Sequence, residues 1–256
     1  MKLPTVPDFD EPVIGVEGAS VRYLVPREHV GTFKEYAIRK IQRRIFNDEF
    51  WALRNVNFQV KKGEIFGVIG ANGAGKSTLL KLVARIMRPS EGRVWVKGRV
   101  APLLAMGAGF HPELSGRENV FLNGTLLGYS EKQIRERFDA IVEFAELKEF
   151  IDAPIRTFSS GMQARLGFAV ATDQKPDILI VDEALAVGDT AFQEKSLGRI
   201  REYQQKGTTT LFVSHAMGEI ERTCQRAAWL HHGQLMFIGD AKEAVDRYLG
   251  RLPNTL

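Results

Sequence analysis

The stretch that decides the fold is "IFGVIGANGAGKSTLLKLV", residues Ile65 to Val83. It opens with a short, continuous apolar run, typical of a strand buried on both faces, and closes with apolar residues at helical spacing. The turn between them, Gly70 to Thr78, matches the pattern G-x-x-x-x-G-K-[ST], with the strand before it and the helix after it that the pattern requires. The sequence therefore predicts a phosphate-binding loop for a nucleoside triphosphate.

Each residue type in this loop has a chemical reason to be there. Glycines let backbone N–H groups turn toward the phosphates, where a Cβ would block the approach, and the helix N-terminus adds partial positive charge. Lys76 is predicted to reach the β- and γ-phosphates, and Ser77 to offer its hydroxyl to Mg²⁺, so a nucleoside triphosphate and Mg²⁺ are the expected cofactors. The residues expected to hold the nucleotide are Gly70, Asn72, Gly73, Gly75, Lys76, Ser77 and Thr78.

The composition is that of a globular protein. The chain has 256 residues, 44% hydrophobic and 26% charged, and a formal charge of +4, which permits nucleic acid or anionic lipid as a partner but does not require either. Its one cysteine, Cys224, excludes an intramolecular disulfide. The start has prolines and acids where a signal peptide needs an apolar run, and no window approaches the ~18 apolar residues that span a bilayer. We expect a cytoplasmic protein unless something else holds it to a membrane.

Strand and helix patterns alternate along the chain, which favours an α/β domain with a parallel sheet. The predicted strands are "PVIGVEGASVRYLV", "FWALRNVNFQV", "IFGVIG", "GRVWVKGRVAPLL", "DILIVDE" and "TTTLFVSH". Helical patterns cover "KSTLLKLVARIM" and the stretch from Ser130 to Glu149, and residues 115–172 are predicted to form an inserted helical subdomain. We expect one domain over residues 1–256.

Two acids close the apolar strand "DILIVDE". Asp182 is placed to hold Mg²⁺ through water, and Glu183 to polarise the attacking water. Two acids after a strand are commonly just the start of a solvated loop, but the phosphate loop upstream favours the functional interpretation.

Four ordered motifs give the chain a family resemblance. "FSSGMQARL" resembles the signature sequence of ATP-binding cassette (ABC) ATPases, and "ALAVGD" is similar to the segment that ends in their D-loop aspartate, here Asp189. "LFVSHAMGEIERTCQRAAWLHHGQL" resembles their switch region, with His215 as the sensor of the γ-phosphate. The resemblance implies a P-loop NTPase fold with a parallel core sheet, a small antiparallel β subdomain and an inserted helical subdomain.

The resemblance also implies a homodimer that sandwiches two ATP molecules. Each nucleotide would be held by one chain's phosphate loop and by the other's signature, here Ser159, Ser160, Gly161 and Met162. Tyr23 is the first candidate to stack on adenine and Trp51 the second, with plain core packing as the alternative for either ring.

The sequence departs from the family pattern in ways that matter. Ser160 stands where a glycine is usual, and Met162 where a glutamine is usual. The segment from Arg99 to Asn119 has no glutamine, and Met106 lies near the position of the family's Mg²⁺-contacting glutamine. Methionine is a poor ligand for this hard cation, so the metal would depend on Ser77, Asp182, phosphate oxygens and water.

These departures resemble one branch of the family, the ATPase subunits that export O-antigen, capsule or teichoic-acid polymers on lipid carriers. The resemblance implies a partner with many membrane spans in two copies, a lipid-linked glycan as cargo, and a position on the cytoplasmic face of the inner membrane. Some members carry a C-terminal carbohydrate-binding domain, which we do not expect after "RYLGRLPNTL". The alternatives are an importer or small-molecule exporter ATPase, and an ABC protein acting on nucleic acid, which we do not favour.

A basic amphipathic stretch, "KEYAIRKIQRRIF", precedes the phosphate loop. Thr32 and Glu35 have the spacing of a capping box, and Asn47 and Asp48 supply an expected end, so an insert helix is predicted at about residues 31–48. A solvated surface helix is the plain interpretation. The functional one is a helix under the membrane that meets anionic lipid or the cargo headgroup through Tyr36, Arg39, Lys40, Arg43 and Arg44.

Overall fold

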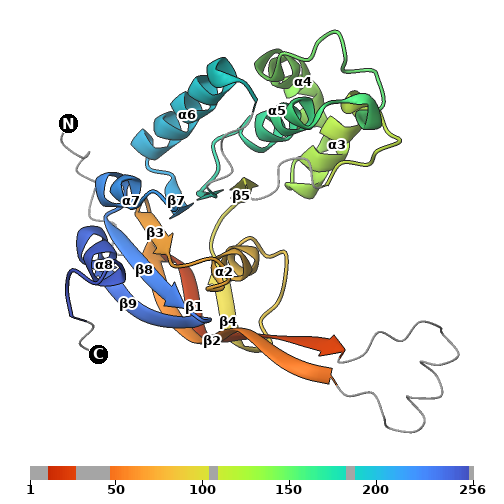
Figure 1. Cartoon of the computed structure of the whole chain (residues 1–256). Helices are drawn as coiled ribbons and strands as arrows, with labels where there is room; N and C mark the ends of the chain where they lie inside the picture. The colour runs from red at the N-terminus through yellow and green to blue at the C-terminus, as the bar shows by residue number, and fades with distance from the viewer. Residues whose placement is uncertain (1–10, 27–46, 104–108, 183–187, 254–256) are drawn as a thin grey trace, which may run out of the picture.

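The protein combines two sheets with a separate group of helices (Figure 1). The computed structural model describes residues 11–26, 47–103, 109–182 and 188–253. The six-stranded sheet and its helices form one layer, and the three-stranded sheet packs against it. The helices α3, α4 and α5 lie together beyond the β5 end of the larger sheet (Figure 1).

The larger sheet has the order β5-β6-β7-β3-β8-β9. Five strands run parallel, and β9 pairs antiparallel with β8. The short apolar strands at its centre, such as β3, are fully buried because sheet and helices cover both faces. The strands are β3 (Ile65–Ile69), β5 (Val100–Leu103), β6 (Ile178–Val181), β7 (Thr209–Val213), β8 (Arg226–His231) and β9 (Gln234–Asp240).

The smaller sheet is antiparallel, in the order β2-β1-β4. Its strands are β1 (Pro12–Pro26), β2 (Asn47–Lys61) and β4 (Glu91–Val96). The inner faces of β1 and β2 join β3 and α2 (Lys76–Val83) in one core, where the rings of Phe58 and Phe66 stack at 5.4 Å between centroids. The far ends of β1 and β2 project from the body as a ribbon (Figure 1).

The helical group has its own core and its own start signals. It contains α3 (Gly116–Leu126), α4 (Glu131–Ala145), a 3₁₀ turn (Ile155–Thr157) and α5 (Ser160–Ala171). Ser115 and Ser130 each begin a helix with a full capping box, closed by Glu118 and Gln133. The remaining helices, α6 (Thr190–Gln205), α7 (Met217–Thr223) and α8 (Ala241–Tyr248), flank the larger sheet.

The predicted fold class is confirmed, with corrections at element ends. α2 stops at Val83, earlier than its pattern predicted, because Arg85 takes a left-handed φ of 59° and donates to the Val96 carbonyl. α4 stops at Ala145 because Glu146 is left-handed (φ 59°). "GRVWVKGRVAPLL" is two strands in different sheets, β4 and β5, separated at Gly98 (φ 95°).

The predicted insert helix lies mostly outside the described residues. Residues 47 and 48 belong to β2, where Asp48 pairs with Val25 of β1, so a helix in this segment would end before residue 47. Residues 27–46, including Tyr36, Arg39, Lys40, Arg43 and Arg44, are not described.

Candidate functional site

The candidate site lies where three neighbouring parallel strands end. β7 pairs with β6 on one side and with β3 on the other, all in parallel. The carboxyl ends of these strands therefore share one edge of the sheet. The phosphate loop follows β3, Asp182 follows β6, and Ser214 and His215 follow β7. Three motifs far apart in the sequence are thus brought together by strand order.

The backbone of the phosphate loop depends on its glycines at two close approaches. Gly70 has a φ of 146°, and a Cβ there would lie 2.3 Å from the Leu230 carbonyl oxygen. Gly75 has a φ of 104°, and a Cβ there would lie 2.6 Å from the Ala52 carbonyl oxygen. The backbone of β2 and of the end of β8 therefore packs against the loop and leaves no room for a side chain at these two glycines.

Lys76 lies folded over the loop and is almost fully buried. Its Nζ donates to the carbonyl oxygens of Gly70 (2.7 Å) and Ala71 (3.0 Å). These bonds hold the ammonium group at the phosphate loop, where it can contact an anionic ligand. A lysine ammonium beside backbone N–H groups is a common binding group for phosphate, so this position suits a polyphosphate.

The start of α2 is open toward a ligand. Its N-cap, Gly75, offers no side chain to the first backbone N–H groups. Ser77 is exposed in the first turn of α2, and Thr78 is half-buried beside it. A helix N-terminus with exposed hydroxyls and a lysine suits a phosphate group. The expected ligand residues Gly70, Asn72, Gly73, Gly75, Lys76, Ser77 and Thr78 thus lie on one continuous loop and turn.

The donor set for a metal ion is small, and it fits Mg²⁺ when phosphate is present. Asp182 is half-buried directly after β6, and Ser77 opens α2. Among residues 11–26, 47–103, 109–182 and 188–253, no cluster of three or more His, Cys, Asp or Glu side chains has the arrangement of a metal site. Mg²⁺ keeps several waters and uses one or two protein oxygens with substrate phosphates, so two oxygen donors are sufficient.

His215 stands exposed between β7 and α7. The residue before it, Ser214, is buried, and its Oγ accepts from the Ala216 backbone N–H (3.0 Å) and donates to Glu219 (3.2 Å). These bonds fix the turn that carries His215. The imidazole is therefore displayed at the sheet edge by a rigid support.

The signature residues begin α5 in the helical group. The Oγ of Ser159 caps the helix by accepting from the Met162 backbone N–H (3.2 Å). Ser159 and Ser160 are exposed, and a Cβ at Gly161 would have 3.8 Å of room to its nearest neighbour. α5 packs mainly on α4, α3 and β5, whereas the phosphate loop lies at the end of β3. The signature thus presents an open helix N-terminus on a different part of the molecule.

Asp189, the predicted D-loop aspartate, caps α6. Its Oδ1 accepts from the Phe192 backbone N–H (2.9 Å), and this bond, with the nearby Arg165 guanidinium, lowers the pKa of the carboxyl. Asp189 therefore stays ionised at neutral pH, and α6 begins where the D-loop ends.

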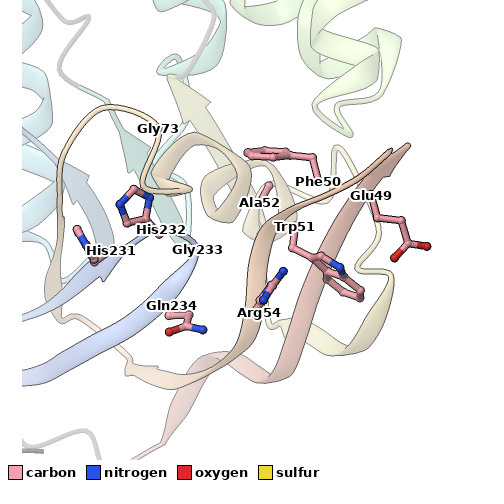
Figure 2. A pocket seen from close by; sticks show the side chains of 10 residues that line it. All are labelled: Glu49, Phe50, Trp51, Ala52, Arg54, Gly73, His231, His232, Gly233 and Gln234. Atoms are coloured by element: carbon pink, nitrogen blue, oxygen red, sulfur yellow. The ribbon is translucent and has the colours of Figure 1, made fainter. Parts of the chain in front are cut away.

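A hollow of about 530 Å³ lies beside the phosphate loop (Figure 2). β2, the phosphate loop and the β8–β9 turn line it, through Glu49, Phe50, Trp51, Ala52, Arg54, Gly73, His231, His232, Gly233 and Gln234. Phe50 and Trp51 project to opposite sides of β2 (Figure 2). The Arg54 guanidinium lies 5.7 Å from the centre of the Trp51 ring. Aromatic and polar side chains thus line a hollow directly beside the phosphate loop.

The sequence named only part of this hollow. Trp51, the second candidate for adenine, lines it, whereas Tyr23 does not: Tyr23 is paired with Phe50 on the neighbouring strand, and its hydroxyl lies 3.8 Å from the Met87 sulfur. Phe50 and Arg54 were missed, although "FWALR" stands out as an aromatic pair before the loop. His231 and His232 gave no signal, because they come from a turn over 150 residues later.

Two further predicted functional positions, besides those of the insert segment, lie outside the described residues. Glu183, the expected catalytic base, follows Asp182 directly but falls in 183–187. Met106, in place of the expected glutamine, falls in 104–108.

Comparison with known proteins shows the family to which the chain belongs. Residues 53–186 match the sequence profile of the ABC transporter family. The chain is 46% identical over 241 residues to the O-antigen export system ATP-binding protein RfbB of Klebsiella pneumoniae, covering 93% of this chain and 98% of that one. The chain belongs to the ABC transporter family.

Other ABC proteins extend this similarity. The teichoic acids export ATP-binding protein TagH of Bacillus cereus is 43% identical over 210 residues, 82% of this chain and 38% of TagH. Among solved structures, an ATP-binding subunit of an ABC transporter aligns with a TM-score of 0.69 at 24% identity, over 93% of both chains. The dimeric cassette MJ0796, bound to ADP and Pi, aligns with a TM-score of 0.67 at 21% identity, over 89% of this chain and 98% of that one. Within the described ranges, no helix has the length and apolarity to span a bilayer.

Proposed function

We propose that this chain is the ATP-hydrolysing subunit of an exporter, and that it powers a separate membrane permease that moves lipid-linked polysaccharide across the cytoplasmic membrane. The observation that supports ATP hydrolysis is that the phosphate loop, Asp182 and His215 lie at the same edge of the sheet. Similarity to export subunits such as RfbB and TagH supports the cargo class, which is O-antigen, capsule or teichoic acid.

Residue roles follow from the chemistry of phosphoryl transfer to water. Lys76 and the N-terminal N–H groups of α2 would bind the phosphates, while Ser77 and Asp182 would hold Mg²⁺, which would supply positive charge against the phosphate oxygens. Glu183 takes a proton from the attacking water, and His215 contacts the γ-phosphate from the neighbouring strand. The result is release of ADP and phosphate.

We assign the second half of each site to a partner copy. Within one chain, Ser159, Ser160, Gly161 and Met162 start a helix of the helical group, away from the phosphate loop. In a head-to-tail homodimer, the serine hydroxyls and N–H groups at this helix start would meet the γ-phosphate bound by the other chain. The cassette MJ0796, which shares this fold, has a dimeric structure with ADP and Pi bound.

For adenine we keep two candidates. Trp51 is supported by its place in the lining of the hollow beside Gly73. Tyr23 is supported by its place near the end of β1, where the family resemblance implies the aromatic ring that stacks on adenine. ATP affinity after Trp51→Ala and after Tyr23→Ala distinguishes them, because loss of a stacked ring costs about 1–3 kcal/mol.

The insert segment and the cellular position belong to the same proposal. The subunit would sit at the inner face of the membrane through its permease, with two ATPase and two permease copies. Tyr36, Arg39, Lys40, Arg43 and Arg44 would face anionic lipid or the phosphate of the cargo headgroup. Neutralising Arg39, Arg43 and Arg44 should impair export and leave basal ATPase intact; unimpaired export would exclude this role.

Hydrolysis is tested with Glu183→Gln in the purified full chain. Loss of a general base should lower ATP turnover about 10²–10⁴-fold while ATP binding survives. The control is Glu131→Gln, an exposed carboxylate on α4 far from the sheet edge, which should change neither. Near-normal turnover in Glu183→Gln would remove Glu183 from the catalytic role.

The cargo is tested in the cell by deleting the gene. Lipid-linked glycan trapped on the cytoplasmic side, restored by the wild-type gene, supports polysaccharide export. Unchanged surface polymer would favour another cargo, such as a small molecule, with the same ATPase.

A further inference from the structure

Four charged side chains form a connected chain of ion pairs where the helical group meets α6. Arg165 of α5 contacts Asp189 at the start of α6 and Glu146 at the end of α4 (NH1 to Oε2, 3.3 Å). Lys195 of α6 donates to Glu146 Oε1 (2.9 Å) and to the Phe144 carbonyl (3.0 Å). The network balances two positive charges with two negative ones and joins three helices.

Arg165 is the centre of this network. Its side chain is only 18% exposed, and its guanidinium lies 5.1 Å from the centre of the Phe192 ring. A Cβ on Gly188 would lie 3.1 Å from Arg165 Nε, and Gly188 has a φ of 77°. The backbone just before Asp189 is therefore shaped to let the guanidinium approach the carboxylate.

The network connects two motifs of the hydrolysis site. Arg165 lies in the second turn of the helix that Ser159 caps, and Asp189 comes seven residues after Asp182. Through this contact, the helix that begins at the signature is joined directly to Asp189 at the start of α6.

Stability alone is a weak reason for these ion pairs. The partners Asp189 and Glu146 are 62% and 53% exposed, and exposed pairs contribute little because water and salt screen them. A well-placed arginine whose partners are exposed is better explained by the geometry that it imposes.

We propose that Arg165 is a positioning residue for ATP hydrolysis, which acts through Asp189 so that the signature start of α5 and the D-loop keep one relative geometry. This inference rests on the proposed ATPase function. The proposal predicts that loss of Arg165 lowers the rate of hydrolysis in the ATP-bound complex and leaves the affinity of the phosphate loop for ATP unchanged.

The test is ATPase kinetics of the full chain with Arg165→Gln, Arg165→Lys, Asp189→Asn and the Arg165→Gln/Asp189→Asn double variant. Asparagine keeps the cap of α6 but removes the charge that Arg165 contacts. We expect kcat to fall about 2- to 30-fold in Arg165→Gln with ATP affinity unchanged, and the double variant to lose no more than the worse single one. Arg165→Lys should restore part of the rate, because lysine keeps the charge but cannot fork between two carboxylates.

The matched control is Arg135→Gln on α4, which breaks an exposed ion pair with Glu131 remote from both motifs and should leave kcat unchanged. Unchanged kcat in Arg165→Gln, or full additivity in the double variant, overturns the inference while the ATPase stands. A wild-type chain without turnover instead contradicts the proposed function. If Arg165→Gln does not fold, Asp189→Asn and Arg165→Lys decide: wild-type kcat in both also overturns it.

Discussion

Two glycines of the phosphate loop should respond very differently to the same substitution. Gly75 and Gly73 both have positive φ, 104° and 77°. A Cβ on Gly75 would lie 2.6 Å from the Ala52 carbonyl oxygen and 2.8 Å from Leu53 Cδ2, whereas a Cβ on Gly73 would meet no atom within 4 Å. Gly75→Ala therefore adds a steric clash to the backbone strain, and Gly73→Ala adds the strain alone.

The magnitudes follow from these contacts. For Gly73→Ala, a left-handed non-glycine residue costs about 1–2 kcal/mol of the free energy of unfolding. For Gly75→Ala, backbone strain of about 1–3 kcal/mol adds to overpacking of about 1–3 kcal/mol, because the clashing atom is backbone and cannot turn away. The second sum, about 2–6 kcal/mol, is a large part of the ~5–15 kcal/mol that stabilises a typical protein.

Thermal unfolding followed by circular dichroism is the assay. At about 2–4 °C per kcal/mol for a chain near this size, we expect Tm to fall about 2–8 °C in Gly73→Ala and about 4–24 °C in Gly75→Ala. Equal shifts in the two variants, or a larger shift in Gly73→Ala, would refute the claim that the strand β2 fixes the loop at Gly75. Repeating the scans with MgATP separates stability from binding, because a bound ligand raises Tm.

Three further predictions concern single groups. Burial raises the pKa of the Cys224 thiol to about 12, so it should resist maleimide from pH 7 to 9 in the native chain and react once urea unfolds it; rapid native labelling would contradict its burial. Hydrogen bonds from Ser115 lower the pKa of the Glu118 carboxyl in the folded chain, so this carboxyl takes up a proton at a higher pH in the unfolded chain than in the folded one. The stabilisation that these bonds give the folded chain is therefore present above about pH 4.3 and is lost as the pH falls further. Glu118→Gln keeps the capping box, so acid titration of its Tm should be flatter than in the wild type. Ser159→Ala removes the cap of α5 and should cost about 0.5–2 kcal/mol in urea unfolding, with Ser159→Asn as the control that keeps a cap.

Much of the fold could be predicted because its signals are local. An apolar run followed by glycines and a helical period identifies β3, the phosphate loop and α2 without any knowledge of the rest. Ser130 starts α4 where the predicted helical pattern begins, and Ser115 starts α3 at the predicted beginning of the helical subdomain. The ends of α2 and α4 were harder to predict from the sequence, because they depend on contacts with distant residues. Arg85 bonds to the Val96 carbonyl, and Glu146 pairs with Arg165.

The hollow beside the phosphate loop shows what the sequence could not determine. Phe50 and Trp51 are adjacent in the chain but point to opposite sides of β2, and His231 is the last residue of the distant strand β8. A pattern along the chain cannot tell which of two neighbouring aromatic rings faces a ligand unless strand pairing and register are known.

The sequence by itself determined the chemistry: a lysine and hydroxyls for phosphate, acids for a hard metal ion, and the order of motifs of an ABC ATPase. The tertiary structure decided which of these groups meet. Strand order β6-β7-β3 brings Asp182, His215 and the phosphate loop to one edge, and the contact of Arg165 with Asp189 joins the signature helix to the D-loop. The physical reason is that residue type and local spacing fix what a side chain can bind, whereas the pairing of distant strands and helices fixes where it is.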